Sequence, residues 1–302
     1  MRVAVVGGGI AGLATAAALR RAGIATTVYS ESRVRVSGTP MEAVGPLGLG
    51  LWTNALRCLE LLEPRALAAL AAKGRWMSDA SYRERDGRWI AGPSRPLASG
   101  CASGEPAMLF VSHADLQASL ESMVPSSSVV LQESRVRRFE AAGRDGGLRL
   151  VFEDGSTSEE SFDLLVGADG RHSAVREQLS VEASTRELKR LSAGKNRAAN
   201  GTLIANGAAA PYALHKMGYV VFRGVACGQL EDSGSFQTWG GDGRRFAAVP
   251  MSEGRYSWFA TIPVQSTEAI DGFGGADPLR WLQSYATSLH ICSVCVSACL
   301  RV

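Results

Sequence analysis

The chain has 302 residues, of which 46% are apolar and 20% are charged, and its formal net charge is +3. This composition excludes a disordered chain, and the small charge excess argues against a nucleic-acid-binding protein. No run of about 18 apolar residues is present, so no transmembrane helix is expected.

The amino-terminal segment predicts one half of a doubly wound α/β fold. An apolar, β-branched strand over 2–6 stops at a glycine-rich turn, and an alanine-rich helix runs from there to about Ala22. Gly23 ends this helix, and a second strand follows over 25–29. This order of elements is typical of a mononucleotide-binding unit. Because a core strand opens the chain and leaves no room for a signal sequence, we expect a cytoplasmic protein.

The turn between the first strand and the helix has the pattern of a phosphate-binding loop. Gly7 permits a tight turn, Gly9 lets the backbone approach a pyrophosphate, and Gly12 lets the helix pack closely on the strand. The N–H groups and the dipole of the helix N-terminus attract phosphates. The alternative is a structural turn without a ligand, although three glycines cost conformational entropy that such a turn need not incur.

The second strand should end in an acidic residue that binds a ribose hydroxyl. Ser30 follows the strand instead, and the acid, Glu31, comes one residue later. Glu31 can reach the ribose if the strand ends in a bulge, and Ser30 can make a weaker, neutral contact.

Further elements are predicted in the middle of the chain. Asp86-Gly87 is a strong hairpin signal, and Asn54 is a plausible helix N-cap. The expected elements are a strand and helix over 49–62, hairpin strands over 80–85 and 88–91, a helix over 115–123, and strands over 129–139, 148–152 and 158–162.

A second motif follows over 163–176. An apolar strand ends in a Gly-Ala-Asp-Gly turn that contains Asp169, and a short basic helix is expected after it. A carboxylate at the carboxyl end of a parallel strand, beside the glycine turn of the first strand, lies where a doubly wound sheet binds its ligand. The alternative is that Asp169 only caps the helix that follows.

Residues 200–263 predict an antiparallel sheet of short strands that carries large aromatic side chains. Such a sheet can cover an apolar ligand pocket. The alternative for each ring is that it only packs the sheet onto a layer of helices.

The two motifs resemble the signatures of the class A FAD-dependent aromatic hydroxylases, a family that includes p-hydroxybenzoate, salicylate and urate hydroxylases and zeaxanthin epoxidase. The turn at 7–12 is similar to the amino-terminal fingerprint, and 163–170 with Ser173 and Arg176 is similar to the second signature. The resemblance implies an α/β fold in which a doubly wound, Rossmann-like FAD-binding domain carries an inserted antiparallel substrate domain. It implies FAD-binding segments at 1–75 and 105–180, substrate-domain segments at 76–104 and 181–275, and an atypical tail at 276–302.

The resemblance also implies a reaction. NAD(P)H reduces the bound FAD, O₂ forms a flavin C4a-hydroperoxide, and one oxygen atom passes to a small aromatic or alkene substrate. The expected partners are therefore a small molecule and O₂, without nucleic acid. No residue is assigned as a catalytic acid or base, because members of the family differ on that point.

Carried over by position, the resemblance gives two sets of site residues. The expected cofactor-binding residues are Gly7, Gly9, Ile10, Ala11, Gly12, Ser30 or Glu31, His113, Val136, Asp169 and Gly170. Val136 is expected near the adenine, and the turn at Asp169 serves both the flavin and the nicotinamide cofactor. The expected substrate-binding residues are Tyr219, Phe222, Arg223, Trp239 and Phe246.

The sequence departs from the family pattern at two places. Where the family usually has an arginine before Ala-Asp-Leu, this chain has His113, which carries a charge only when protonated, so its contact with the flavin should be weaker. The later Gly-Asp block of the family is absent, so we expect that the carboxyl-terminal part of the flavin domain is missing. The alternative function is therefore a truncated, catalytically impaired member that binds flavin weakly or not at all.

Other classes of protein fit the sequence less well. A nicotinamide-only dehydrogenase would not need the second motif. Cys292, Cys295 and Cys299 lack a fourth ligand at metal-site spacing, so no metal site is expected. The histidines form no evident Ser-His-Asp arrangement, which argues against a hydrolase.

Overall fold

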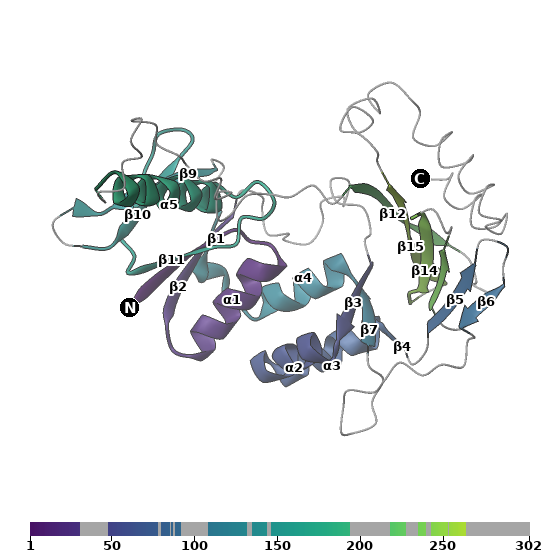
Figure 1. The fold of residues 1–302 in the computed structure, drawn as a ribbon. Coiled ribbons are helices and arrows are strands. Elements are labelled where there is room, and N and C mark those ends of the chain that lie inside the picture. The colour runs from purple at the N-terminus through teal and green to yellow at the C-terminus, as the bar shows by residue number, and fades with distance from the viewer. Residues whose placement is uncertain are drawn as a thin grey trace, which may run out of the picture. The chain divides into compact units, whose positions relative to one another are not determined.

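The chain divides into two compact units, Met1–Gly38 with Leu120–His215 and Thr39–Ser119 with Lys216–Val302 (Figure 1). The computed structural model describes residues 1–30, 48–77, 80–84, 86, 88–91, 108–131, 135–143, 146–193, 218–227, 235–239, 243–252 and 254–263. Glu31 and the tail at 276–302 lie outside these residues. The domain limits expected from the sequence stay a prediction.

The first unit is built on a four-stranded parallel sheet. Its members are β1 (Arg2–Val6), β2 (Ala25–Ser30), β8 (Val129–Leu131) and β11 (Leu164–Gly167), in the spatial order β11-β1-β2-β8. The earliest strand thus lies between the second and the last, which is the strand order of a doubly wound sheet. Val3, Ala4 and Val5 are fully buried, so β1 runs through the middle of the core. The predicted doubly wound fold is confirmed.

The crossover between the first two strands is α1 (Ile10–Arg21). Its buried face consists of Leu13 and of the small residues Gly12, Ala16 and Ala17. Because these side chains are small, the helix can lie close to the sheet. Arg20 and Arg21 occupy the last turn, where positive charge complements the helix dipole.

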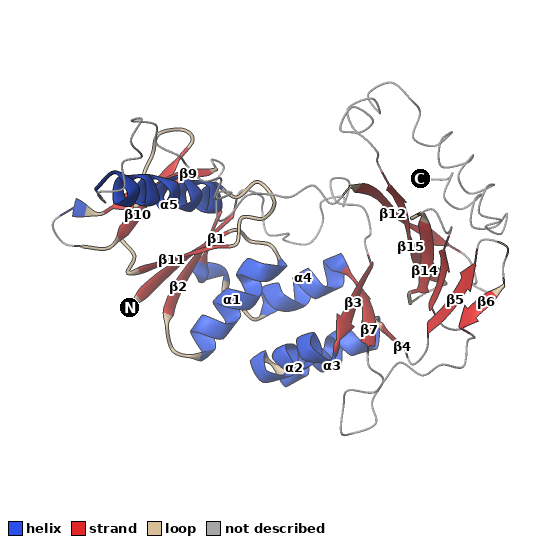
Figure 2. Ribbon diagram, in the orientation of Figure 1, coloured by secondary structure: helices blue, strands red, loops and turns tan. Residues whose placement is uncertain are grey.

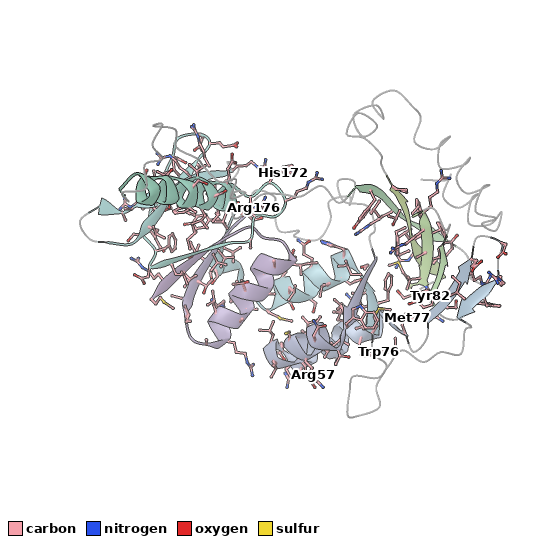
Figure 3. All side chains as sticks on the ribbon, viewed as in Figure 1. Arg57, Trp76, Met77, Tyr82, His172 and Arg176 are labelled. Atoms are coloured by element: carbon pink, nitrogen blue, oxygen red, sulfur yellow. The ribbon has the colours of Figure 1, made fainter. Side chains whose placement is uncertain are left out.

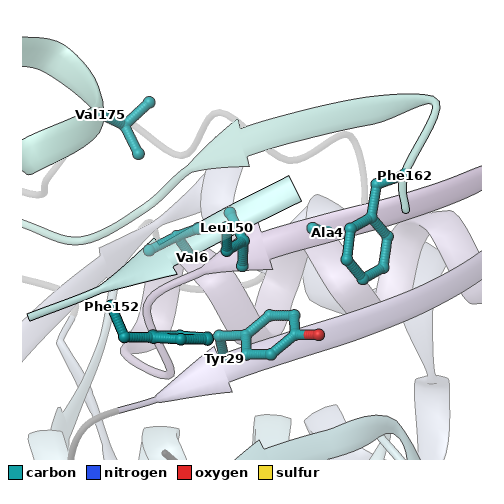
Figure 4. Close-up of a cluster of buried hydrophobic side chains, with 7 residues drawn as sticks. All are labelled: Ala4, Val6, Tyr29, Leu150, Phe152, Phe162 and Val175. Atoms are coloured by element: carbon teal, nitrogen blue, oxygen red, sulfur yellow. The ribbon is translucent and has the colours of Figure 1, made fainter. Parts of the chain in front are cut away.

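A second layer of the first unit packs on this sheet. β9 (Val136–Ala141) pairs antiparallel with β10 (Leu148–Phe152), and the expected return strand at 158–162 is limited to bridges at Thr157 and Phe162. Side chains from both layers form one buried apolar cluster, Ala4, Val6, Tyr29, Leu150, Phe152, Phe162 and Val175 (Figure 4). Tyr29 lies at its centre, with ring centroids 5.9 Å from those of Phe152 and Phe162.

The helix after β11 is longer than the sequence indicated. α5 (Ala174–Ala193) has 20 residues, whereas a short basic helix was expected. Figure 2 shows it lying beside β9, and Val175 at its start joins the buried cluster. A single turn of 3-10 helix, η1 (Ser126–Ser128), precedes β8. None of the helices within the described ranges is long and apolar enough to cross a membrane.

The second unit contains a three-stranded antiparallel sheet with the strand order β3-β7-β4. Its strands are β3 (Gly48–Trp52), β4 (Arg75–Met77) and β7 (Met108–Ser112), and its helices are α2 (Thr53–Leu62), α3 (Pro64–Lys73) and the start of α4 (His113–Ser122). α2 begins at Thr53 with Trp52 as N-cap, so the expected cap, Asn54, lies inside the helix. The next helix, α3, is capped by Glu63, whose carboxylate accepts a hydrogen bond from the N–H of Arg65 at 3.1 Å.

A six-stranded sheet completes the second unit. In spatial order it contains β12 (Tyr219–Cys227), β15 (Arg255–Pro263), β14 (Arg245–Pro250), β13 (Ser235–Trp239), β5 (Ala80–Glu84) and β6 (Trp89–Ala91). Its pairings are antiparallel, as expected, except that β13 and β5 run parallel. The expected hairpin forms β5 and β6, and Asp86 closes it by accepting from the N–H of Arg88 at 2.9 Å.

The large sheet packs one face on the small one. Val225 and Val249 from the large sheet form a buried cluster with Phe110 and with Met77, Met108 and Met251. Gly48 makes the close approach possible, since a Cβ at that position would lie 2.5 Å from Cζ of Phe110 and 2.8 Å from Cβ of Ser257. The two sheets therefore share a buried apolar layer.

Burial of Tyr29 makes the first unit sensitive to alkaline pH. Desolvation, with the nearby carboxylates of Glu160 and Glu159, raises the pKa of Tyr29 to about 12. The unfolded chain releases this proton near pH 10 and the folded chain holds it, so the stabilisation is complete below about pH 10 and is lost as the pH rises toward 12. Between pH 8 and pH 11 we expect a loss of about 1.4 kcal/mol that Tyr29→Phe removes. Urea unfolding at both pH values measures it, and an equal fall for both proteins contradicts the prediction.

Candidate functional site

The candidate site lies at the carboxyl edge of the parallel sheet in the first unit. β1, β2 and β11 run in the same direction, and Val6 pairs with both Tyr29 and Gly167. The N–H of Gly7 donates to the carbonyl of Tyr29 at 2.8 Å, and the N–H of Ala168 donates to that of Val6 at 2.7 Å. The glycine turn, the end of β2 and the second motif are thereby brought to one place, as the sequence predicted.

Two glycines let three backbone segments meet without side chains between them. Gly7 has a φ of +112°, and a Cβ there would overlap the carbonyl of Ala168 and lie 2.9 Å from the N of Asp169. At Gly12 a Cβ would overlap the carbonyl oxygen of Gly7. The first turn of α1 therefore packs directly on the glycine turn, and the glycine turn packs directly on the second motif.

The N-terminus of α1 is left open at this edge. Gly9 is its N-cap and makes no side-chain cap hydrogen bond, and the first turn contains no acidic residue. Gly9 and Ala11 are exposed, Ile10 is half-buried, and a Cβ on Gly9 would meet nothing within 4 Å. Free N–H groups at the positive end of a helix dipole, with open space before them, suit a phosphate or another anion.

Asp169 is fixed by hydrogen bonds within the second motif. Its carboxylate accepts from the hydroxyl of Ser173 at 2.6 Å and from the N–H of Val175 at 3.3 Å. Ser173 in turn accepts from the N–H of Arg176 at 3.0 Å, so both residues cap the start of α5. The helix-capping role that the sequence left open is present. A contact of Asp169 with a ligand stays a prediction.

Arg176 also forms hydrogen bonds with the turn that follows Asp169. Its guanidinium donates to the carbonyl of Gly170 at 3.2 Å and to that of Arg171. Figure 3 shows Arg176 and the exposed His172 at this end of α5. The conformation of the turn at Gly170 is therefore set by the residues of the second motif themselves.

Two more expected cofactor residues flank the edge. Ser30 is buried at the end of β2, where it pairs in register with Leu131 of β8. Val136 is the first residue of β9 and packs against the cluster that contains Tyr29. Glu31, the other candidate for the ribose, lies outside the described residues.

His113 belongs to the second unit, where it is the half-buried first residue of α4. A capping arrangement that the sequence analysis missed holds this helix start. Asp115 receives a hydrogen bond from the hydroxyl of Ser112 at 2.5 Å, and its own N–H donates back to Ser112 at 3.0 Å. Lys73 Nζ lies 3.5 Å from the Asp115 carboxylate. The Ser-x-x-Asp spacing is the signal that would have revealed it.

The expected substrate residues divide between the two faces of the large sheet. Tyr219 and Arg223 are exposed, whereas Phe246 is 2% exposed and stacks on Trp258 at a centroid distance of 6.3 Å. In register, Phe222 and Phe246 both pair with Ala260, while Arg223 pairs with Phe259 and Trp239 with Arg245. Because side chains alternate along a strand, one pocket cannot be lined by Phe246 and Arg223 together.

The chain belongs to a family of FAD binding domains, whose pattern matches residues 1–218. Curated relatives include 3-amino-4-hydroxybenzoate 2-monooxygenase of Streptomyces cremeus, 32% identical over 278 residues, which are 90% of this chain and 59% of the relative. The aurachin C monooxygenase/isomerase of Stigmatella aurantiaca is 32% identical over 289 residues, with shares of 91% and 63%. The chain thus spans about three fifths of the length of these relatives. The predicted family membership is confirmed.

Solved structures support the fold. Klebsiella pneumoniae HpxO in complex with FAD and uric acid has a TM-score of 0.65 and 23% identity, and the similarity covers 96% of this chain and 61% of that chain. A 2-methyl-3-hydroxypyridine-5-carboxylic acid oxygenase has a TM-score of 0.63 and 18% identity, with coverage of 100% and 67%. At these identities the similarity establishes the arrangement of the elements.

The open N-terminus of α1 is the feature of the site that fits FAD. A pyrophosphate needs backbone donors without competing carboxylates, and the turn at Gly9 provides them. Among the described residues, no group of histidine, cysteine, aspartate and glutamate side chains could hold a metal ion.

Removal of the Asp169 carboxylate should destabilise the first unit. Asp169→Ala leaves the hydroxyl of Ser173 and the N–H of Val175 without their acceptor, and we expect a loss of about 1–3 kcal/mol in the free energy of unfolding. Asp154→Ala is the matched control, because Asp154 accepts from Ser156 in an exposed turn. Urea unfolding compares the two variants. Equal stabilities would show that Asp169 does not hold the start of α5.

Proposed function

We propose that this chain binds FAD in its first unit and acts as an NAD(P)H-dependent monooxygenase on a small aromatic substrate. The observation that carries the proposal is the open, uncapped N-terminus of α1 at Gly9, held against the second motif through Gly7 and Gly12. The family match supports FAD as the ligand. The Streptomyces cremeus relative, whose name gives 3-amino-4-hydroxybenzoate as its substrate, supports an aromatic substrate.

In this proposal, different residues of the first unit contact different parts of the cofactor. The backbone N–H groups at the start of α1, including those of Ile10 and Ala11, hold the pyrophosphate. Ser30 or Glu31 contacts the adenosine ribose, and Val136 lies against the adenine. Asp169 fixes the turn at Gly170 that faces the flavin and the nicotinamide cofactor. Bound FAD would supply the redox chemistry, which is acceptance of a hydride from NAD(P)H and activation of O₂.

The second unit provides the surface for the substrate. Tyr219 and Arg223 are exposed on β12. Val225, two residues after Arg223, lies on the same face of the strand and belongs to the apolar layer between the two sheets. A substrate ring can lie beside the exposed side chain of Tyr219, and the guanidinium of Arg223 can bind an anionic substituent. His113 contributes the donor that the family places at the start of this helix. An alkene is the alternative substrate in this proposal, which also includes a cytoplasmic location.

Two glycine variants separate binding from folding. Gly9→Ala adds a methyl group in open space, so the free energy of unfolding should change by less than about 1 kcal/mol. The same methyl group takes the place of an approaching phosphate oxygen, and we expect FAD affinity to fall at least about tenfold. Gly12→Ala forces a Cβ against the carbonyl of Gly7, and should lower stability by about 2 kcal/mol or more.

Titration with FAD, followed by flavin fluorescence, and urea unfolding give both quantities for each protein. A Gly9→Ala protein that binds FAD as tightly as the wild type would place the pyrophosphate elsewhere. A wild-type chain that binds no FAD contradicts the proposed function itself and favours the impaired family member. If FAD binds, oxidation of NAD(P)H that increases with an aromatic acid supports the monooxygenase activity.

A further inference from the structure

The side chain of Gln178 on α5 pairs with the backbone of β9 as a neighbouring strand would. The N–H of Phe139 donates to Oε1 of Gln178 at 2.9 Å, and Nε2 of Gln178 donates to the carbonyl of Phe139 at 2.9 Å. Nε2 also donates to Glu182, one turn later on the helix, at 3.0 Å. One primary amide therefore satisfies both backbone groups of a single residue at the edge of a strand.

This pairing fixes β9 on the side where it has no strand partner among the described residues. On its other side β9 pairs with β10, and Phe139 pairs there with Leu150. Gln178 is thus a clamp between α5 and the outer edge of β9. The clamp needs both a donor and an acceptor at the length of a glutamine side chain.

Val136 begins β9, three residues before the clamped Phe139, and the register against β10 shifts between the two. Val136 pairs with Phe152, whose ring packs on Tyr29, and Tyr29 is followed by Ser30 at the carboxyl end of β2. In a doubly wound sheet the ribose of a dinucleotide lies at the end of this strand, so the attached base extends past it. The start of β9 packs beside this end of β2, which makes it a wall for the base.

The same helix also begins at the phosphate edge. α5 starts at the cap formed by Asp169 and Ser173, and Gln178 lies about one turn further along. α5 therefore connects the turn that packs on Gly7 with the wall at Val136.

We propose that Gln178 is a positioning residue for the adenine half of the dinucleotide, which it affects through β9 without touching the ligand. This inference rests on the proposed FAD binding. It predicts that loss of the clamp weakens binding of ligands that carry an adenosine and spares ligands that carry only the flavin half. The clamp thus favours FAD over FMN.

Three variants test this role. Gln178→Glu keeps the size of the side chain, but it replaces the donor to Phe139 with a second acceptor and puts a like charge beside Glu182. Gln178→Met removes both hydrogen bonds without adding charge, and serves if the charged variant does not fold. Glu182→Gln is the matched control, because it changes the residue that contacts Gln178 and leaves the clamp on Phe139 in place.

Two measurements are made on the full chain. Hydrogen exchange read by mass spectrometry reports the protection of amides in β9, independently of any ligand. Affinities for FAD, ADP and FMN report the two halves of the site. We expect Gln178→Glu and Gln178→Met to expose the β9 amides and to weaken FAD and ADP by about tenfold each, with FMN unchanged within about twofold. Glu182→Gln should match the wild type in every measurement.

Each other outcome overturns a defined part of the inference. Unchanged protection in β9 shows that Gln178 is not a clamp. Lost protection with equal weakening of FAD, ADP and FMN shows a general structural role, without preference for the adenine half. A wild-type chain that binds none of the three ligands overturns the proposed function and with it the ligand role of Gln178, while the exchange measurement still decides whether the clamp exists.

Discussion

The backbone of the turn after β1 lies directly on the backbone of the turn after β11, and the candidate site depends on this contact. Gly7 touches the carbonyl of Ala168 through a conformation with positive φ, and Gly12 lets α1 pack onto Gly7. Any side chain at either glycine would separate the three segments. Because the contact is made by backbone alone, the N-terminus of α1 stays uncovered at Gly9, which is the condition for binding a phosphate.

Polar side chains hold this arrangement in place around its edge. Asp169 and Ser173 fix the start of α5, and Gln178 fixes β9 to the same helix. Asp163 contributes at the opposite end of β11, where its carboxylate accepts from the N–H of Arg2 at 2.6 Å. The second motif therefore supports the glycine turn from the neighbouring strand. The second unit adds a separate surface, on which exposed Arg223 lies two residues before Val225 of the apolar layer.

The sequence was sufficient where the signal is local. The strand at 2–6, the glycine turn and the Asp169 turn follow from a few adjacent residues, and parallel strands must end at one edge of a sheet. The sequence could not show which face of the large sheet each side chain occupies. The pairing register places Phe246 in the core and Arg223 outside, and this register depends on contacts between distant strands. Similarly, Gln178 gives no local signal, since a glutamine on a helix reads as a solvated residue until Phe139 is known to lie beside it.

Hydrogen exchange of the wild-type chain with and without FAD decides whether the cofactor binds at these two turns. We expect FAD to protect the amides of residues 8–12 and of the turn at 168–170, because the two turns pack against each other at Gly7. Protection confined to the second unit, or unchanged exchange at a FAD concentration that saturates binding, would contradict it.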